Sequence, residues 1–124
     1  MACSGTRVGY DEVRRRALEN GGLFHVAAYV DKRGPIGINT GRCSARYRKR
    51  YENSDLFHHE LHAEVDLLRQ MRVAPERIRV VRFYRDGSLA MARPCVHCQN
   101  YLRHRGVREV RYTNWMGQWE TMRL

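Results

Sequence analysis

Apolar residues recur along this chain with two different periods, and each period predicts one kind of element. A spacing of about three to four residues is typical of a helix with one buried face, whereas alternation and β-branched enrichment are typical of strands. The helical segments are residues 10–20, 59–71 and 95–105, and the strand segments are residues 23–30, 36–40, 77–85, 107–114 and 118–124. The order predicts an α/β fold with a five-stranded mixed sheet flanked by helices.

Short turns between these segments restrict how neighbouring strands pair. A short stretch that contains Gly34 and Pro35 joins residues 23–30 to residues 36–40, which predicts a hairpin. The segment around Gly117 is too short to hold a crossover helix. The last two strands should therefore pair antiparallel.

The length and composition fit one globular domain. The chain has 124 residues, of which 43% are hydrophobic and 29% charged, and we expect a single domain over residues 1–124. No apolar run approaches the ~20 residues that cross a bilayer, and the first residues lack the apolar stretch of a signal peptide. We therefore expect a cytoplasmic protein with no membrane partner. Its four cysteines should be reduced, which favours a metal or catalytic role over disulfides.

The chain is strongly basic, and arginine accounts for almost all of the excess. It has 23 Lys and Arg residues against 13 Asp and Glu, a formal charge of +10, and only Lys32 and Lys49 are lysines. Composition alone leaves two interpretations open. A GC-rich genome favours arginine without any functional demand, whereas a polyanionic partner such as nucleic acid attracts basic domains electrostatically.

Two short segments combine residues that bind zinc. An H-A-E segment begins at His62 in the middle predicted helix, and a P-C-V-H-C segment begins at Pro94 where the next helix starts. One imidazole and two thiolates make three protein ligands, and a zinc site with three protein ligands keeps a fourth position open for catalysis. Helix N-termini also lower the pKa of thiols, which favours the thiolate that a metal requires. We predict His62, Cys95 and Cys98 as ligands of a Zn2+ ion.

This pattern resembles the zinc-dependent nucleobase deaminase superfamily, whose signature is H-x-E followed by P-C-x-x-C. Cys95 follows His62 by 33 positions, with a predicted strand between two helices. The resemblance implies a cytidine-deaminase-like three-layer α-β-α fold and a Zn2+ cofactor. It makes Glu64 the catalytic residue, which takes a proton from water and protonates the ring nitrogen and the departing ammonia. The substrate-binding residues that it implies are Asn39, Ala63, Pro94 and His97.

The C-terminus indicates which members of the superfamily the chain is most similar to. Its predicted hairpin, residues 107–124, resembles that of cytidine deaminases and of several toxin-type and plant organellar editing deaminases, whereas tRNA adenosine deaminases insert a helix there. The chain departs from small cytidine deaminases by its basic charge and by having His62 where those enzymes use cysteine. The resemblance favours cytosine over adenine as the target base and leaves the form of the substrate open.

A segment between the second predicted strand and the middle helix concentrates cations and tyrosines. Residues 41–55 have little apolar periodicity, which predicts a long surface loop. Its candidate nucleic-acid contacts are Arg42, Arg46, Tyr47, Arg48, Lys49, Arg50 and Tyr51. Cations bind phosphates and aromatic rings stack on bases in single-strand channels, although a solvated charged loop would have the same composition.

Four side chains elsewhere are further candidates for stacking on bases. They are His97, Tyr112, Trp115 and Trp119. Tyr112 and Trp119 alternate within predicted strands, so we expect these two to pack against the protein.

Three functions are compatible with these residues. The first is a hydrolytic deaminase of cytosine in single-stranded DNA or RNA, since a base inside a duplex is inaccessible. The second is a deaminase of free cytidine or deoxycytidine, as nucleoside or nucleotide. The third is a non-catalytic, zinc-stabilised nucleic-acid-binding module. A structural zinc ribbon would need a fourth ligand, and residues 58–62 lack the H-E-x-x-H spacing of a zinc protease.

Overall fold

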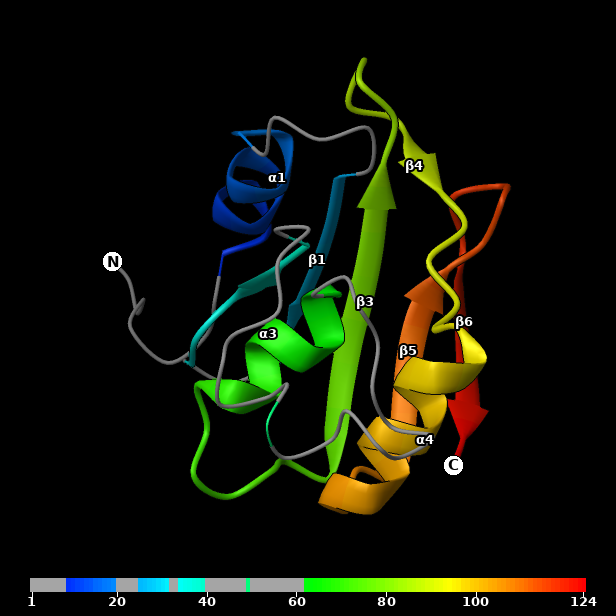
Figure 1. Cartoon of the computed structure of the whole chain (residues 1–124). Coiled ribbons are helices and arrows are strands. Elements are labelled where there is room, and N and C mark those ends of the chain that lie inside the picture. Colours follow the sequence, from blue (N-terminus) through cyan, green and yellow to red (C-terminus); the bar gives the residue numbers. More distant parts are fainter. Residues whose placement is uncertain (1–8, 20–24, 32–33, 40–48, 50–61) are drawn as a thin grey trace.

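The computed structural model of the chain describes residues 9–19, 25–31, 34–39, 49 and 62–124. These residues form three helices and six strands (Figure 1). The helices are α1 (Tyr10–Glu19), α3 (Ala63–Arg69) and α4 (Val96–Arg105). The strands are β1 (His25–Tyr29), β2 (Gly37–Ile38), β3 (Arg77–Phe83), β4 (Leu89–Ala90), β5 (Glu109–Thr113) and β6 (Trp119–Arg123). The α/β class is confirmed, and each predicted helix and strand has a counterpart among the described residues. The predicted ends at residues 20, 23–24, 40 and 59–61 lie outside the described residues.

All described strands belong to one mixed sheet. The strand order is β2-β1-β3-β5-β6, and β4 pairs with β3 beyond the end of β5. β3 and β5 run parallel because α4 carries the chain from one to the other, and every other pair is antiparallel. The predicted hairpin of β1 and β2 and the predicted antiparallel pairing of the last two strands are confirmed.

The sheet has six strands, and the predicted number of five is wrong. The added strand is β4, which follows the tight turn after β3 and pairs Leu89 with Phe83 and Ala90 with Arg82. Two residues are too few to show an alternating period, so the pattern of apolar positions predicts no strand after the turn. From β4 the chain continues directly into the segment that opens α4.

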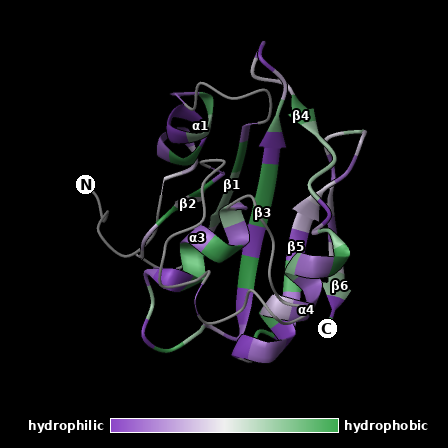
Figure 2. Ribbon diagram, in the orientation of Figure 1, coloured by the Kyte–Doolittle hydropathy of each residue, from purple (hydrophilic) through white to green (hydrophobic). Residues whose placement is uncertain are grey.

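Successive side chains of the central strands point to opposite faces of the sheet, and a separate apolar core lies on each face. Ala28 and Val80 belong to the core beneath α3 and α4, whereas Ala27 and Val81 belong to the core beneath α1. Hydrophilic bands separate hydrophobic ones along β3 (Figure 2). Helices therefore cover both faces, and α3 and α4 pack side by side on one of them (Figure 1).

α3 and α4 are also joined at their C-terminal ends. Gly106 ends α4 with a left-handed backbone, φ 97°, a conformation that favours glycine. Arg105, in the last turn of α4, donates hydrogen bonds to the carbonyl oxygens of Leu68 and Met71 at the end of α3. This contact between the helix ends holds the N-termini of both helices at the same end of the sheet.

Two sequence predictions concern regions that the structure describes only in part. In the described residues, no helix is long and apolar enough to cross a bilayer. The basic segment 41–55 lies outside the described residues except for Lys49, whose side chain is exposed. The single domain and the cytoplasmic location stay predictions.

Candidate metal centre

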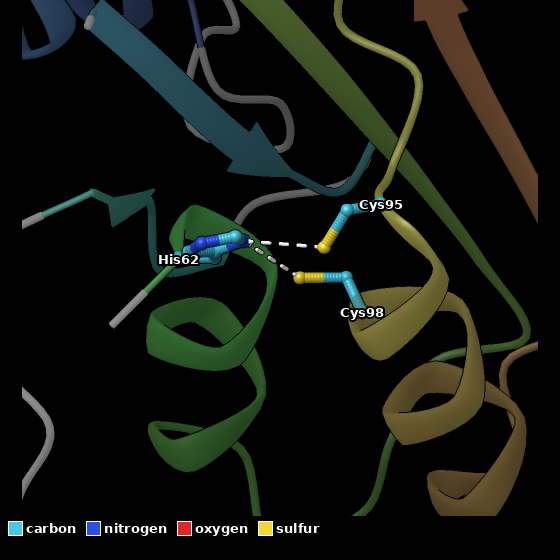
Figure 3. A group of neighbouring side chains, drawn as sticks. All are labelled: His62, Cys95 and Cys98. Atoms are coloured by element: carbon cyan, nitrogen blue, oxygen red, sulfur yellow. Dashed lines mark hydrogen bonds between the residues drawn. The ribbon is translucent and has the colours of Figure 1, made fainter. Parts of the chain in front are cut away.

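His62 and Cys95 occupy equivalent places at the N-termini of two helices. Each precedes the first helical residue with an extended backbone, ψ 159° for His62 and ψ 167° for Cys95. Their carbonyl oxygens accept helical hydrogen bonds from the amides of Asp66 and Gln99. Cys98 lies one turn further along α4 and is buried. Because α3 and α4 pack side by side, the three predicted ligand side chains point toward one another (Figure 3).

The three ligand atoms are close enough to share one metal ion. His62 Nδ1 lies 3.1 Å from Cys98 Sγ and 3.6 Å from Cys95 Sγ, and all three atoms lie within 4.8 Å of one another. Tetrahedral zinc, with bonds of about 2.1 Å to nitrogen and 2.3 Å to sulfur, separates its ligand atoms by about 3.5 to 3.8 Å. The donor set thus fits a metal ion, and its two sulfurs suit soft metals rather than magnesium or calcium.

Electrostatic interactions within the cluster distinguish the two cysteines. A hydrogen bond with the Cys98 thiol, reinforced by His62, lowers the pKa of Cys95 to about 3. The same hydrogen bond, together with burial, raises the pKa of Cys98. Cys95 therefore loses its proton more readily than Cys98 does. A metal cation would favour the thiolate of Cys98 as well, since coordination deprotonates a thiol.

Glu64 places a buried carboxyl group beside the ligands. It is the second residue of α3, and only 4% of its surface is exposed. Burial raises the pKa of Glu64, while hydrogen bonding to its own backbone amide and the charge of His62 offset part of that increase. Its carboxylate also interacts with Cys98. A raised pKa moves a carboxyl group toward the range in which general acid–base groups work.

The edge strand β2 is attached to the helix turn that carries Glu64. Gly37 lies so close to α3 that a Cβ atom at this position would overlap the carbonyl oxygen of Ala63. The Ile38 amide donates a hydrogen bond of 2.8 Å to the buried carboxylate of Asp66. Sequence reasoning did not single out Gly37 or Asp66, because neither belongs to a motif. Only the packing of β2 on the helix reveals their role.

The four predicted substrate-binding residues differ in burial and contacts. Ala63 and Pro94 are buried, at the start of α3 and just before α4, whereas His97 is exposed in the first turn of α4. Asn39 directly follows β2, and its Oδ1 atom accepts a hydrogen bond of 3.0 Å from the Val26 amide. This oxygen therefore stabilises the hairpin. The contact of Asn39 with a substrate sugar stays a prediction.

The aromatic candidates separate into buried and exposed residues. Tyr112 is buried, as expected. Trp119, which was expected to pack against the protein, does so only in part, since it is 39% exposed. It lies on the sheet edge strand β6, and its ring contacts the guanidinium group of Arg79, whose carbon lies 5.0 Å from the ring centroid. Trp115, in the turn between β5 and β6, is also exposed.

Most predicted nucleic-acid contacts lie outside the described residues. They are Arg42, Arg46, Tyr47, Arg48, Arg50 and Tyr51. The prediction that these side chains lie near the metal centre and contact nucleic acid therefore stays a prediction.

No protein-family model, no curated protein and no solved structure matches this chain. The case for a function therefore depends on the residues and geometry of the site itself.

Proposed function

We propose that this chain is a zinc-dependent hydrolytic deaminase that converts cytosine to uracil in single-stranded nucleic acid, on a cytidine-deaminase-like three-layer scaffold. The observation that carries the proposal is the buried Glu64 carboxylate beside the clustered ligand atoms of His62, Cys95 and Cys98. This arrangement combines three metal ligands with a group that can transfer protons. A bound zinc ion supplies Lewis acidity, which lowers the pKa of a water molecule toward neutrality.

Glu64 carries out the proton transfers in the proposed reaction. The reaction adds water at C4 of cytosine, breaks the bond between C4 and the amino nitrogen, and releases ammonia. Glu64 accepts one proton from the attacking water and delivers it to the ring nitrogen N3. It then accepts the second proton of that water, from the new hydroxyl group on C4, and delivers it to the departing amino group. Its burial limits exchange of these protons with bulk solvent. Backbone amides near Ala63 and Cys95, at the N-termini of two helices, stabilise the charge that develops on the substrate.

The net charge supports a polyanionic substrate over a free nucleoside. The chain carries a formal charge of +10, from which a neutral nucleoside gains no electrostatic attraction. A nucleic-acid strand gains attraction at every phosphate, which raises both its affinity and its rate of association. A target base stacked in a duplex could not reach a buried carboxylate, so the substrate is single-stranded or locally unpaired.

The test is a parallel assay of the zinc-loaded protein on cytidine, deoxycytidine monophosphate and a cytosine-containing single-stranded oligonucleotide. We expect ammonia release and uracil formation, fastest on the oligonucleotide. Glu64→Gln preserves the size of the side chain and removes its capacity to transfer protons. We expect the deamination rate of this variant to fall by about 10²- to 10⁴-fold, the usual contribution of a general acid–base group. The variant should retain zinc.

Glu12→Gln is the matched control, because it removes an exposed carboxylate from α1, on the opposite face of the sheet. Its rate should equal that of the unmodified chain. Undiminished activity of Glu64→Gln would overturn the proposed mechanism. Zinc binding without ammonia release on any of the three substrates would favour the zinc-stabilised binding module instead.

A further inference from the structure

One face of the sheet carries a cluster of arginines, and it is the face opposite to the helices that carry the motif segments. We call it the arginine face, and it consists of Arg77, Arg79, Arg111, Arg123 and Trp119. These residues come from β3, β5 and β6, so the cluster exists only in the folded chain. It lies on the side of the sheet opposite to α3 and α4, beside the part that α1 covers.

Strand register places these side chains in rows. Arg77 pairs with Glu109, which pairs with Arg123, and two residues further along Arg79 pairs with Arg111. Trp119 pairs with Thr113 in the next row on the same face. Paired residues share a face, and rows two residues apart are separated by about 6.6 Å. This separation is similar to that between successive phosphates of an extended single strand.

A single buried carboxylate contacts arginines of the first two rows. Glu109, whose side chain is 10% exposed, lies 3.5 Å from Arg77, 4.0 Å from Arg111 and 3.7 Å from Arg123. One negative charge cannot neutralise three guanidinium groups. The side chains of Arg111 and Arg123 are 47% and 84% exposed, so their donors face solvent and can bind an anion.

A contact between a cation and an aromatic ring links the second row to the third. Arg79 forms an ion pair with Asp31 and stacks over the indole of Trp119. An indole held beside a guanidinium group offers a flat surface on which a base can stack, as in proteins that bind single strands. The face therefore presents phosphate-binding groups and a stacking group side by side.

We propose that the arginine face binds single-stranded nucleic acid, at a site separate from the metal-ligand cluster of His62, Cys95 and Cys98. Guanidinium groups of Arg77, Arg111 and Arg123 contact phosphates, and Trp119 stacks on a base. An acidic protein would also be attracted by charge, but it would make no use of an exposed indole among arginines spaced along the strands. The inference rests on the proposed substrate class and not on the proposed chemistry, so binding is measured apart from turnover.

The test measures the affinity of the zinc-loaded protein for a labelled oligothymidylate of about 16 nucleotides over a series of salt concentrations. Oligothymidylate contains no cytosine, so no turnover occurs. In Arg111→Gln/Arg123→Gln we expect affinity to fall roughly tenfold, and the salt dependence to lose about 1.4 units of log–log slope, about 0.7 for each phosphate contact. The control is Arg72→Gln/Arg85→Gln, which removes two exposed arginines away from the face. Equal losses in both double variants would overturn the proposal, because they would reflect net charge alone.

Trp119 provides a direct readout of stacking. The sequence contains two tryptophans, so in Trp115→Phe all tryptophan fluorescence comes from Trp119. We expect oligothymidylate to quench this fluorescence with the same dissociation constant that the labelled strand gives. Binding without quenching, or displacement of the strand by polyglutamate at equal charge concentration, would overturn the proposal and favour an acidic protein as partner. Ammonia release plays no part in these outcomes, so failure of the proposed deamination leaves them interpretable.

Discussion

The metal-ligand cluster and the arginine face lie on opposite sides of one sheet, and they differ in how far their polar groups are exposed. The cluster ligand Cys98 and the neighbouring carboxylates of Glu64 and Asp66 are buried, whereas the ligand Cys95 is exposed. On the arginine face, Arg111 and Arg123 have side chains that are largely in solvent. The first region holds a few polar groups close together, whereas the second presents several exposed charges from three strands.

Because of this difference, we expect the buried polar residues to contribute to stability and the exposed ones to contribute little to it. A buried polar group without its partner costs free energy, so the groups around Glu64 affect both chemistry and folding. An exposed ion pair contributes little to stability, because solvent screens it and its long side chains lose entropy. We expect substitutions at the cluster to change stability and metal content, and substitutions on the arginine face to change binding alone.

The largest effect should follow from removing a buried ligand. Cys98→Ala leaves two protein ligands, and we expect zinc content, measured by elemental analysis after dialysis, to fall from about one ion per chain to near zero. A bound ion at about 1,000 times its dissociation constant adds about 4 kcal/mol to the free energy of unfolding. A chelator should therefore lower the melting temperature of the unmodified chain and leave that of Cys98→Ala unchanged.

Cys43→Ala is the matched control for Cys98→Ala, because Cys43 lies outside both motif segments. It should retain zinc and respond to the chelator like the unmodified chain. Full zinc content in Cys98→Ala would contradict the assignment of the cluster as the metal site.

The same contrast explains how much of the molecule could be predicted from its sequence. The cluster was predictable because each of its two motif segments is contiguous in the sequence, one beginning at His62 and the other containing Cys95 and Cys98, and the structure brings the three ligands together. The arginine face was not predictable, since Arg79 and Arg111 are single residues in separate strands and become neighbours only through register. Gly37 and Asp66 were missed for a related reason: their contact depends on where an edge strand packs on a helix.

An intermediate effect is expected at Asp66, which supports the helix turn of Glu64 without being a ligand. Asp66→Ala leaves the Ile38 amide without the acceptor that it now has at 2.8 Å, and breaks the 2.7 Å contact with Arg69. Loss of a buried, charge-assisted hydrogen bond should lower the free energy of unfolding by about 2 kcal/mol. Denaturant unfolding of the zinc-loaded protein measures this change.

Two variants sharpen the result at Asp66. Asp66→Asn keeps an oxygen that can accept from Ile38 and should lose less stability than Asp66→Ala. Glu19→Ala removes the exposed ion pair with Arg15 on α1, and should cost no more than about 0.5 kcal/mol. Equal losses in Asp66→Ala and Glu19→Ala would show that burial does not distinguish these carboxylates.

The smallest effect on stability should come from substitutions on the arginine face. Arg111→Gln and Arg123→Gln each remove one of several ion-pair partners of Glu109. The exposed guanidinium groups of Arg111 and Arg123 lie 4.0 Å and 3.7 Å, respectively, from the Glu109 carboxylate. The other arginines still compensate Glu109, so each change should alter the free energy of unfolding by no more than about 0.5 kcal/mol. The same denaturant titration measures it, in low and in high salt. A loss as large as that of Asp66→Ala would mean that these arginines stabilise the sheet, and the weaker strand binding of the double variant would then reflect damage to the fold.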